Sequence, residues 1–185
     1  MEQEYLILGI DPGTTVMGYS LLRVHVRKSE LIEANVVKMS KLVGQNEKLK
    51  KIFESTNHLI ETYHPQILAI ESPFFGKNPQ SMLKLGRAQG VVIAACLHAG
   101  LEVFEYSPRK IKQSITGNGA ASKEQVAAIL HSMYQFTDAT TYLDATDAMA
   151  VAVCHYLQNR ISFGSNKSEN WEAFLSQHKD RIIRG

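Results

Sequence analysis

Residues 6–15 read Leu6-Ile7-Leu8-Gly9-Ile10-Asp11-Pro12-Gly13-Thr14-Thr15, an apolar run that ends in a carboxylate and a Pro-Gly turn. The run predicts a buried strand with Asp11 at its carboxyl end. A carboxylate there is costly to bury unless a cation meets it. Taken alone, Asp11-Pro12-Gly13 is equally a simple turn former. Its meaning therefore depends on the other acidic residues of the chain.

Three further acids stand in comparable settings. Glu71 follows the apolar residues 67–70, and Asp144 and Asp147 lie in an otherwise apolar helical sequence. Two positions three apart on a helix are separated by about 60° around its axis, so these two share a face. Hard oxygen ligands on rigid elements suit Mg²⁺ or Mn²⁺, and two such ions support phosphodiester hydrolysis. The four acids therefore predict a divalent-metal site.

Each of these acids also has a simpler interpretation. Glu71 can pair with a lysine, and Asp147 can face water. Asp144 lies three residues after Thr141 and can serve as the acid of a helix capping box. One shared cause explains four acids in such settings more economically than four coincidences, which favours the metal site.

Composition places the chain among ordinary globular proteins. Its 185 residues are 44% hydrophobic and 21% charged, enough for one domain with a core. No apolar run reaches the roughly 20 residues of a membrane span, and the N-terminus lacks a signal-peptide pattern. Cys96 and Cys154 lie in apolar helical sequence, as free buried thiols do. We expect a cytoplasmic protein with no membrane association.

The hydrophobic pattern predicts an α/β fold in which helices flank a mixed five-stranded sheet. The expected strands are residues 5–10, 17–26, 31–38, 66–70 and 101–106. The expected helices are residues 41–63, 79–99, 108–115, one beginning after Ser122 with a capping-box sequence, and 143–158. Residues 1–161 are expected to form this domain, followed by a polar, flexible tail over residues 162–185.

Basic residues are concentrated between Ser72 and Lys123, where the sequence contains seven lysines and arginines but only two glutamates. Such a stretch can be an ordinary solvated surface. Beside a carboxylate cluster, an electropositive surface suits a polyanionic substrate.

The stretch after the first strand also resembles the first phosphate loop of actin-like ATPases and sugar kinases. Those folds need a second domain and a second Asp-Gly-rich loop, and the sequence contains no second loop of that form. An actin-like ATPase fragment is therefore the competing enzyme class, and it predicts nucleotide binding.

Four motifs occur in order along the chain: Ile10-Asp11-Pro12-Gly13, Ile70-Glu71, Lys84-Leu85-Gly86-Arg87-Ala88-Gln89-Gly90-Val91 and Asp144-Ala145-Thr146-Asp147-Ala148. With Phe104-Glu105-Tyr106 and Lys112-Gln113, they resemble the bacterial RuvC family of Holliday-junction endonucleases over residues 5–160. The resemblance implies a ribonuclease H-like homodimer that resolves four-way DNA junctions in recombination and repair. Paired symmetric nicks would leave 5′-phosphate and 3′-hydroxyl ends.

The resemblance also implies site residues and partners. Asp11, Glu71, Asp144 and Asp147 would be the catalytic acids that bind Mg²⁺, with Mn²⁺ as a substitute and two ions per site. The branch-migration complex RuvA–RuvB would be a partner. A junction-binding protein without catalysis is the alternative, although the acid set is complete.

Candidate DNA contacts lie around this acid set. Phe74 matches the family's stacking position, where an exposed aromatic ring stacks on an unpaired base, or it caps the core instead. Candidate phosphate contacts are Lys77, Arg109, Lys112 and Lys123. Lys112 and Lys123 are also candidates for stabilising charge during cleavage.

Gly86 and Gly90 share one face of their expected helix and permit a close approach by another element. That element is either the sheet of the same domain or a second helix. The resemblance favours a dimer contact, because two active sites must meet a two-fold symmetric junction.

Overall fold

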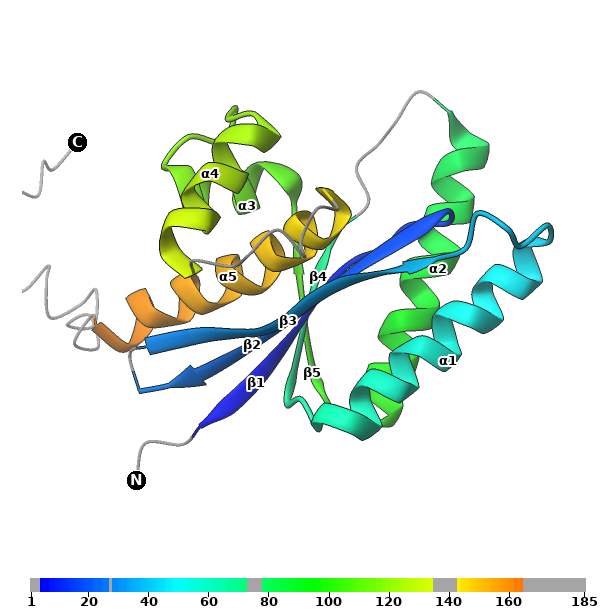
Figure 1. Ribbon diagram of the computed structural model, residues 1–185, viewed down its shortest axis with the longest axis horizontal. Coiled ribbons are helices and arrows are strands. Elements are labelled where there is room, and N and C mark those ends of the chain that lie inside the picture. Colours follow the sequence, from blue (N-terminus) through cyan, green and yellow to red (C-terminus); the bar gives the residue numbers. More distant parts are fainter. Residues whose placement is uncertain (1–3, 27, 73–77, 135–142, 165–185) are drawn as a thin grey trace, which may run out of the picture.

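Five strands form one mixed sheet in the order β3-β2-β1-β4-β5 (Figure 1). The computed structural model describes residues 4–26, 28–72, 78–134 and 143–164. The strands are β1 (Tyr5–Asp11), β2 (Val16–His25), β3 (Lys28–Lys38), β4 (Ile67–Glu71) and β5 (Glu102–Tyr106). Strands β1, β2 and β3 form an antiparallel meander, whereas β4 pairs in parallel with both β1 and β5. The predicted mixed five-stranded sheet is confirmed.

Among the described residues, five helices cover the two faces of this sheet (Figure 1). They are α1 (Gln45–Tyr63), α2 (Pro79–His98), α3 (Pro108–Thr116), α4 (Lys123–Tyr134) and α5 (Leu143–Gly164). Helices α1 and α2 pack on one face, and α3, α4 and α5 pack on the other. The capping box predicted at Ser122 is present, because Ser122 and Gln125 cap α4 reciprocally. The Asn78 side chain caps α2 in addition, accepting from the amides of Gln80 and Ser81.

Two helix boundaries differ from the sequence prediction by more than one residue. Helix α1 begins at Gln45 rather than at residue 41, because Gly44 is extended and the preceding residues form a turn. Leu42 packs against the core from that turn. Its apolar side chain lies at a position that fits the helical spacing, so the prediction included it in the helix. Helix α5 continues to Gly164 rather than residue 158, and Gly164 is its first helix-breaking residue. Residues 162–164 of the predicted tail, residues 162–185, therefore belong to α5, and residues 165–185 lie outside the described residues.

The alternation of β1 decides which side of the sheet receives Asp11. Leu8 and Ile10 belong to the core under α1 and α2, whereas Ile7 belongs to the core under α3, α4 and α5. Because side chains alternate between faces, Asp11 lies on the α5 side together with Ile7. Both cysteines are buried and unpaired, as predicted. Within the described ranges, no helix is both long and apolar enough to cross a membrane.

Candidate active site

Asp11 and Glu71 meet because β1 and β4 are parallel neighbours. Ile10 pairs with Ile70 in the sheet register, so the next residue of each strand lies at the same edge. Ala69 belongs to the core on the α5 side, and the alternation of β4 therefore directs Glu71 to that side too. Asp11 and Glu71 therefore lie side by side at the ends of two neighbouring strands.

Helix α5 brings Asp144 and Asp147 over the same edge because two glycines let it approach the sheet. A Cβ atom on Gly18 of β2 would lie 1.9 Å from the carbonyl oxygen of Asp144. A Cβ atom on Gly9 of β1 would lie 2.4 Å from the carbonyl oxygen of Ala148. Real Cβ atoms do not tolerate such distances, so only glycine permits this packing.

A buried hydrogen bond fixes the helix in this position. The Ser20 hydroxyl of β2 donates to the carbonyl oxygen of Ala148, at 3.0 Å. Ser20 is fully buried, where an unpaired hydroxyl would be costly. Sequence reasoning missed Gly18 and Ser20 as supports of the site. Their signal was two small residues at alternating positions of β2, which leave room for a closely packed element on that face.

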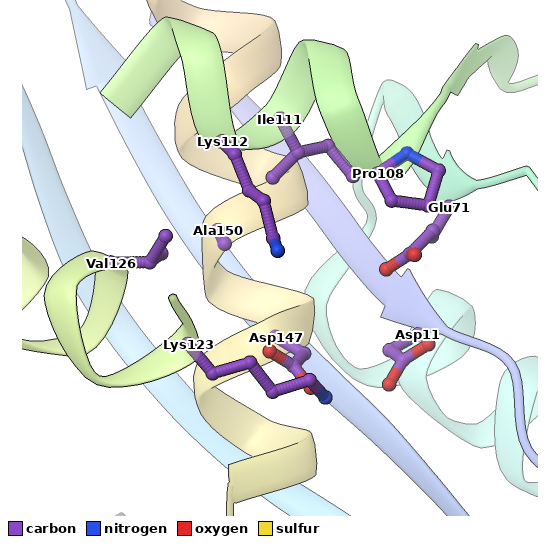
Figure 2. Close-up of a pocket in the computed structure, with 9 residues that line it drawn as sticks. All are labelled: Asp11, Glu71, Pro108, Ile111, Lys112, Lys123, Val126, Asp147 and Ala150. Atoms are coloured by element: carbon purple, nitrogen blue, oxygen red, sulfur yellow. The ribbon is translucent and has the colours of Figure 1, made fainter. Parts of the chain in front are cut away.

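Three of the four acids form a tight cluster. Asp11, Asp144 and Asp147 each offer a carboxylate oxygen, and these oxygens lie within 4.8 Å of one another. Glu71 is not part of this group, but it lines the same cleft as Asp11 and Asp147 (Figure 2). The donor set consists of hard oxygens from rigid elements, which is the set that Mg²⁺ and Mn²⁺ prefer.

The cleft lined by Asp11, Glu71 and Asp147 has a volume of about 210 Å³. Lys112 of α3 and Lys123 of α4 extend into it from the side opposite Glu71 and Asp11 (Figure 2). Apolar side chains from α3, α4 and α5 complete the wall: Pro108, Ile111, Val126 and Ala150. At about 30 Å³ per water molecule, the cleft has room for hydrated ions.

The acids destabilise one another's charge when no cation is bound. Burial raises the pKa of Asp11 to about 8, and repulsion by Glu71 and Asp147 adds to the shift. Burial and repulsion by Asp147 also raise the pKa of Glu71. These raised values mean that the cluster lacks positive charge, which a divalent cation would supply.

Lys123 supplies part of that positive charge. Its ammonium forms an ion pair with Asp147. Burial acts to lower the pKa of Lys123, but the hydrogen bond and the attraction of Asp147 outweigh it and raise the pKa. Lys123 therefore remains protonated inside the acidic cluster.

The other basic candidates take different places. Lys112 lies in the cleft, whereas Arg109 is exposed and lines an adjoining groove of about 830 Å³. The groove continues along the loop at residues 118–120 and shares Pro108 and Lys112 with the cleft. Phe74 and Lys77 lie outside the described residues, and so does Thr141, the proposed capping partner of Asp144.

A ribonuclease H-like sheet that gathers acids from β1, β4 and α5 into one cleft defines a nuclease of the ribonuclease H-like class. The sequence matches the family model "Crossover junction endodeoxyribonuclease RuvC" over residues 7–155. The chain therefore belongs to the RuvC family of endonucleases.

Individual relatives agree over nearly the whole chain. The chain is 51% identical to the crossover junction endodeoxyribonuclease RuvC of Cytophaga hutchinsonii, covering 96% of this chain and 88% of the relative. It is 50% identical to the enzyme of Christiangramia forsetii, covering 98% and 95%. The structure of Thermus thermophilus RuvC in complex with a Holliday junction substrate superposes with a TM-score of 0.79 at 30% identity, covering 85% and 96%. Family membership decides against the actin-like ATPase fragment.

Proposed function

We propose that this endonuclease resolves four-way DNA junctions in the cytoplasm, in recombination and repair. Paired symmetric nicks would leave 5′-phosphate and 3′-hydroxyl ends that ligase can join. The observation that carries the proposal is the cluster of carboxylate oxygens within 4.8 Å, beside a cleft lined by two lysines. A Holliday junction is the substrate named for the Thermus thermophilus relative.

We propose Asp11, Glu71, Asp144 and Asp147 as the catalytic acids. Asp11, Asp144 and Asp147 would hold one Mg²⁺ ion, and Glu71 would join Asp11 or Asp147 in holding a second. Mn²⁺ would substitute, since it accepts the same oxygen ligands. When bound, the ions would supply an activated water and positive charge at the leaving oxygen.

The chain's own residues prepare the cleft for a phosphodiester. Lys123 holds Asp147 through their ion pair and keeps its positive charge within the cluster. Lys112 presents a second ammonium from the neighbouring helix α3, where it can stabilise charge on the scissile phosphate. Arg109 and the adjoining groove would take the phosphates next to the cleavage site. The roles of Phe74 and Lys77 in DNA binding stay predictions.

The outer face of α2 supports the proposal of a homodimer. Leu83 and Leu97 are 65% and 58% exposed, and Gly86 and Gly90 have open space where a Cβ atom would lie. Leu83, Gly90 and Leu97 are seven residues apart, so they form one stripe of the kind that packs against a second helix. Gly86 and Gly90 therefore do not pack against the sheet of the same domain, which was the alternative to a dimer contact. A partnership with RuvA–RuvB is proposed from the family resemblance alone.

An arginine at Gly90 is expected to weaken this dimer. Replacing Gly90 with arginine places a charge in the middle of the stripe, and we expect the protein to shift toward the monomer in sedimentation velocity. Loss of paired cleavage should accompany the shift. The control is Ala128→Arg, which adds the same charge to an exposed position of α4. A Gly90→Arg protein that stays fully dimeric would rule out the α2 face as the interface.

Cleavage assays on an end-labelled mobile four-way junction test the proposed function. We expect paired, ligatable nicks on the junction in Mg²⁺, none in EDTA, and none on a linear duplex of the same sequence. Cleavage of both substrates would show a nuclease that does not select junctions. Binding without cleavage would instead identify a non-catalytic junction-binding protein.

A further inference from the structure

His155 forms a buried polar cluster that does not line the cleft. The side chain of His155 on α5 is fully buried. Its Nδ1 shares a hydrogen bond of 2.8 Å with the hydroxyl of Tyr106 on β5, and its Nε2 lies 2.7 Å from the amide nitrogen of Asn159. The Phe104 ring packs against the imidazole with centroids 4.5 Å apart. The cluster therefore connects β5 to α5.

Tyr106 is also the residue that lies beside Glu71. The two are partners in the parallel register of β4 and β5. The Tyr106 carbonyl accepts a hydrogen bond of 2.9 Å from the amide of Ser72, the residue after Glu71. The backbone of Tyr106 thus holds the end of the strand that carries Glu71, while its phenol reaches the helix that carries Asp144 and Asp147.

This connection matters because Glu71 stands outside the three-carboxylate cluster. Its distance from Asp147 is set by how β4 and β5 sit against α5. His155 is eight residues after Asp147 on the same helix, about 12 Å along a rigid axis. A contact that holds His155 against β5 therefore prevents α5 from rotating about its axis or shifting along it relative to Glu71 at the end of β4.

We propose that the hydrogen bond between Tyr106 and His155 is a positioning contact that sets Glu71 against Asp144 and Asp147 for divalent-metal binding. This inference rests on the proposed function, in which those acids hold the metal. Neither Tyr106 nor His155 lines the cleft, so we infer that they act through the backbone of β5 and through α5.

Both partners of this contact are uncharged near neutral pH. Burial lowers the pKa of His155 to about 4. Burial also raises the pKa of Tyr106 to about 12. In a neutral imidazole one nitrogen donates and the other accepts, and Tyr106 and Asn159 offer a partner to each. Between these two pKa values, the hydrogen bond therefore joins two neutral groups.

Tyr106→Phe tests the proposal by removing only the hydroxyl. Isothermal titration of the DNA-free protein with Mn²⁺ is expected to show about tenfold weaker binding, the low end for losing a group that supports metal ligands. The Mg²⁺ concentration for half-maximal junction cleavage should rise by a similar factor, while kcat at saturating Mg²⁺ stays within about twofold. His155→Gln, which keeps a polar partner for Tyr106, should restore part of the affinity relative to His155→Leu.

Tyr134→Phe is the matched control. This change also removes a tyrosine hydroxyl. Tyr134 is the last residue of α4, and its hydroxyl shares a hydrogen bond of 2.7 Å with that of Ser29 on β3. Both variants should lower the melting temperature, but only Tyr106→Phe should weaken Mn²⁺ binding. Unchanged Mn²⁺ affinity in Tyr106→Phe, or an equal loss in Tyr134→Phe, would overturn the positioning role. If the wild-type protein binds no Mn²⁺, the proposed metal site itself is wrong.

Discussion

Replacing Asp11 with asparagine is expected to abolish metal-dependent cleavage and to make the metal-free protein more stable. The two effects have one cause. Asp11 is the acid whose charge is most strongly opposed by burial and by the neighbouring carboxylates, and its pKa is raised from 3.8 to about 8. The carboxylate suits a divalent cation and is unfavourable without one. Asparagine keeps the shape and removes the charge.

The sign of the pH dependence follows from this raised pKa. Between pH 4 and pH 8 the folded, metal-free protein keeps a proton on Asp11 that the unfolded chain has released. Unfolding then releases a proton, so the stability of the metal-free protein falls as the pH rises through this window. In EDTA, the melting temperature of the wild type should fall from pH 5 to pH 8. That of Asp11→Asn should fall less and lie higher at pH 8.

Activity and metal binding complete the Asp11 experiment. Junction cleavage should drop about a thousandfold or more, which corresponds to ~4 kcal/mol of transition-state stabilisation. Mg²⁺ should raise the melting temperature of the wild type but not that of the variant. The control is Glu54→Gln, which removes an exposed carboxylate of α1. Full cleavage by Asp11→Asn, or an unchanged pH dependence in EDTA, would contradict the assignment.

Local patterns were enough to predict the sheet and the elements that carry the four acids. The apolar run before Asp11 ends where the strand ends, and the acid after residues 67–70 ends the neighbouring strand. The i, i+3 spacing of Asp144 and Asp147 places both on one helix face in any fold. These features depend on residues close together in sequence, which the periods of strands and helices determine directly.

Distances between elements could not be predicted in the same way. Nothing in the sequence separates Glu71 from the other three acids, because its offset depends on how α5 packs against β4 and β5. Lys123 was predicted as a phosphate contact or as a catalytic aid, and only the packing of α4 against α5 brings it to Asp147. The hydrogen bond between Tyr106 and His155 joins residues 49 positions apart, beyond any local pattern.

A methyl group at Gly18, on the strand beneath α5, is expected to damage the site by displacing that helix. Replacing Gly18 with alanine places a Cβ atom 1.9 Å from the carbonyl oxygen of Asp144, a backbone atom that cannot rotate away. Helix α5 must then lift from β2, which strains the buried hydrogen bond between Ser20 and Ala148. We expect a loss of about 2–3 kcal/mol in the free energy of unfolding, as for other overpacked positions.

The loss of activity at Gly18→Ala should exceed what the lower stability explains. Because the first turn of α5 carries Asp144, moving it by even a fraction of an ångström pulls a carboxylate away from Asp11. Cleavage measured well below the melting temperature, at saturating Mg²⁺, should therefore fall at least about tenfold. The matched control is Gly44→Ala, where the nearest contacts are 3.8 Å from the new Cβ and φ is −93°. If Gly18→Ala loses stability but cleaves at the wild-type rate while folded, the contact between β2 and α5 supports the fold without positioning the acids.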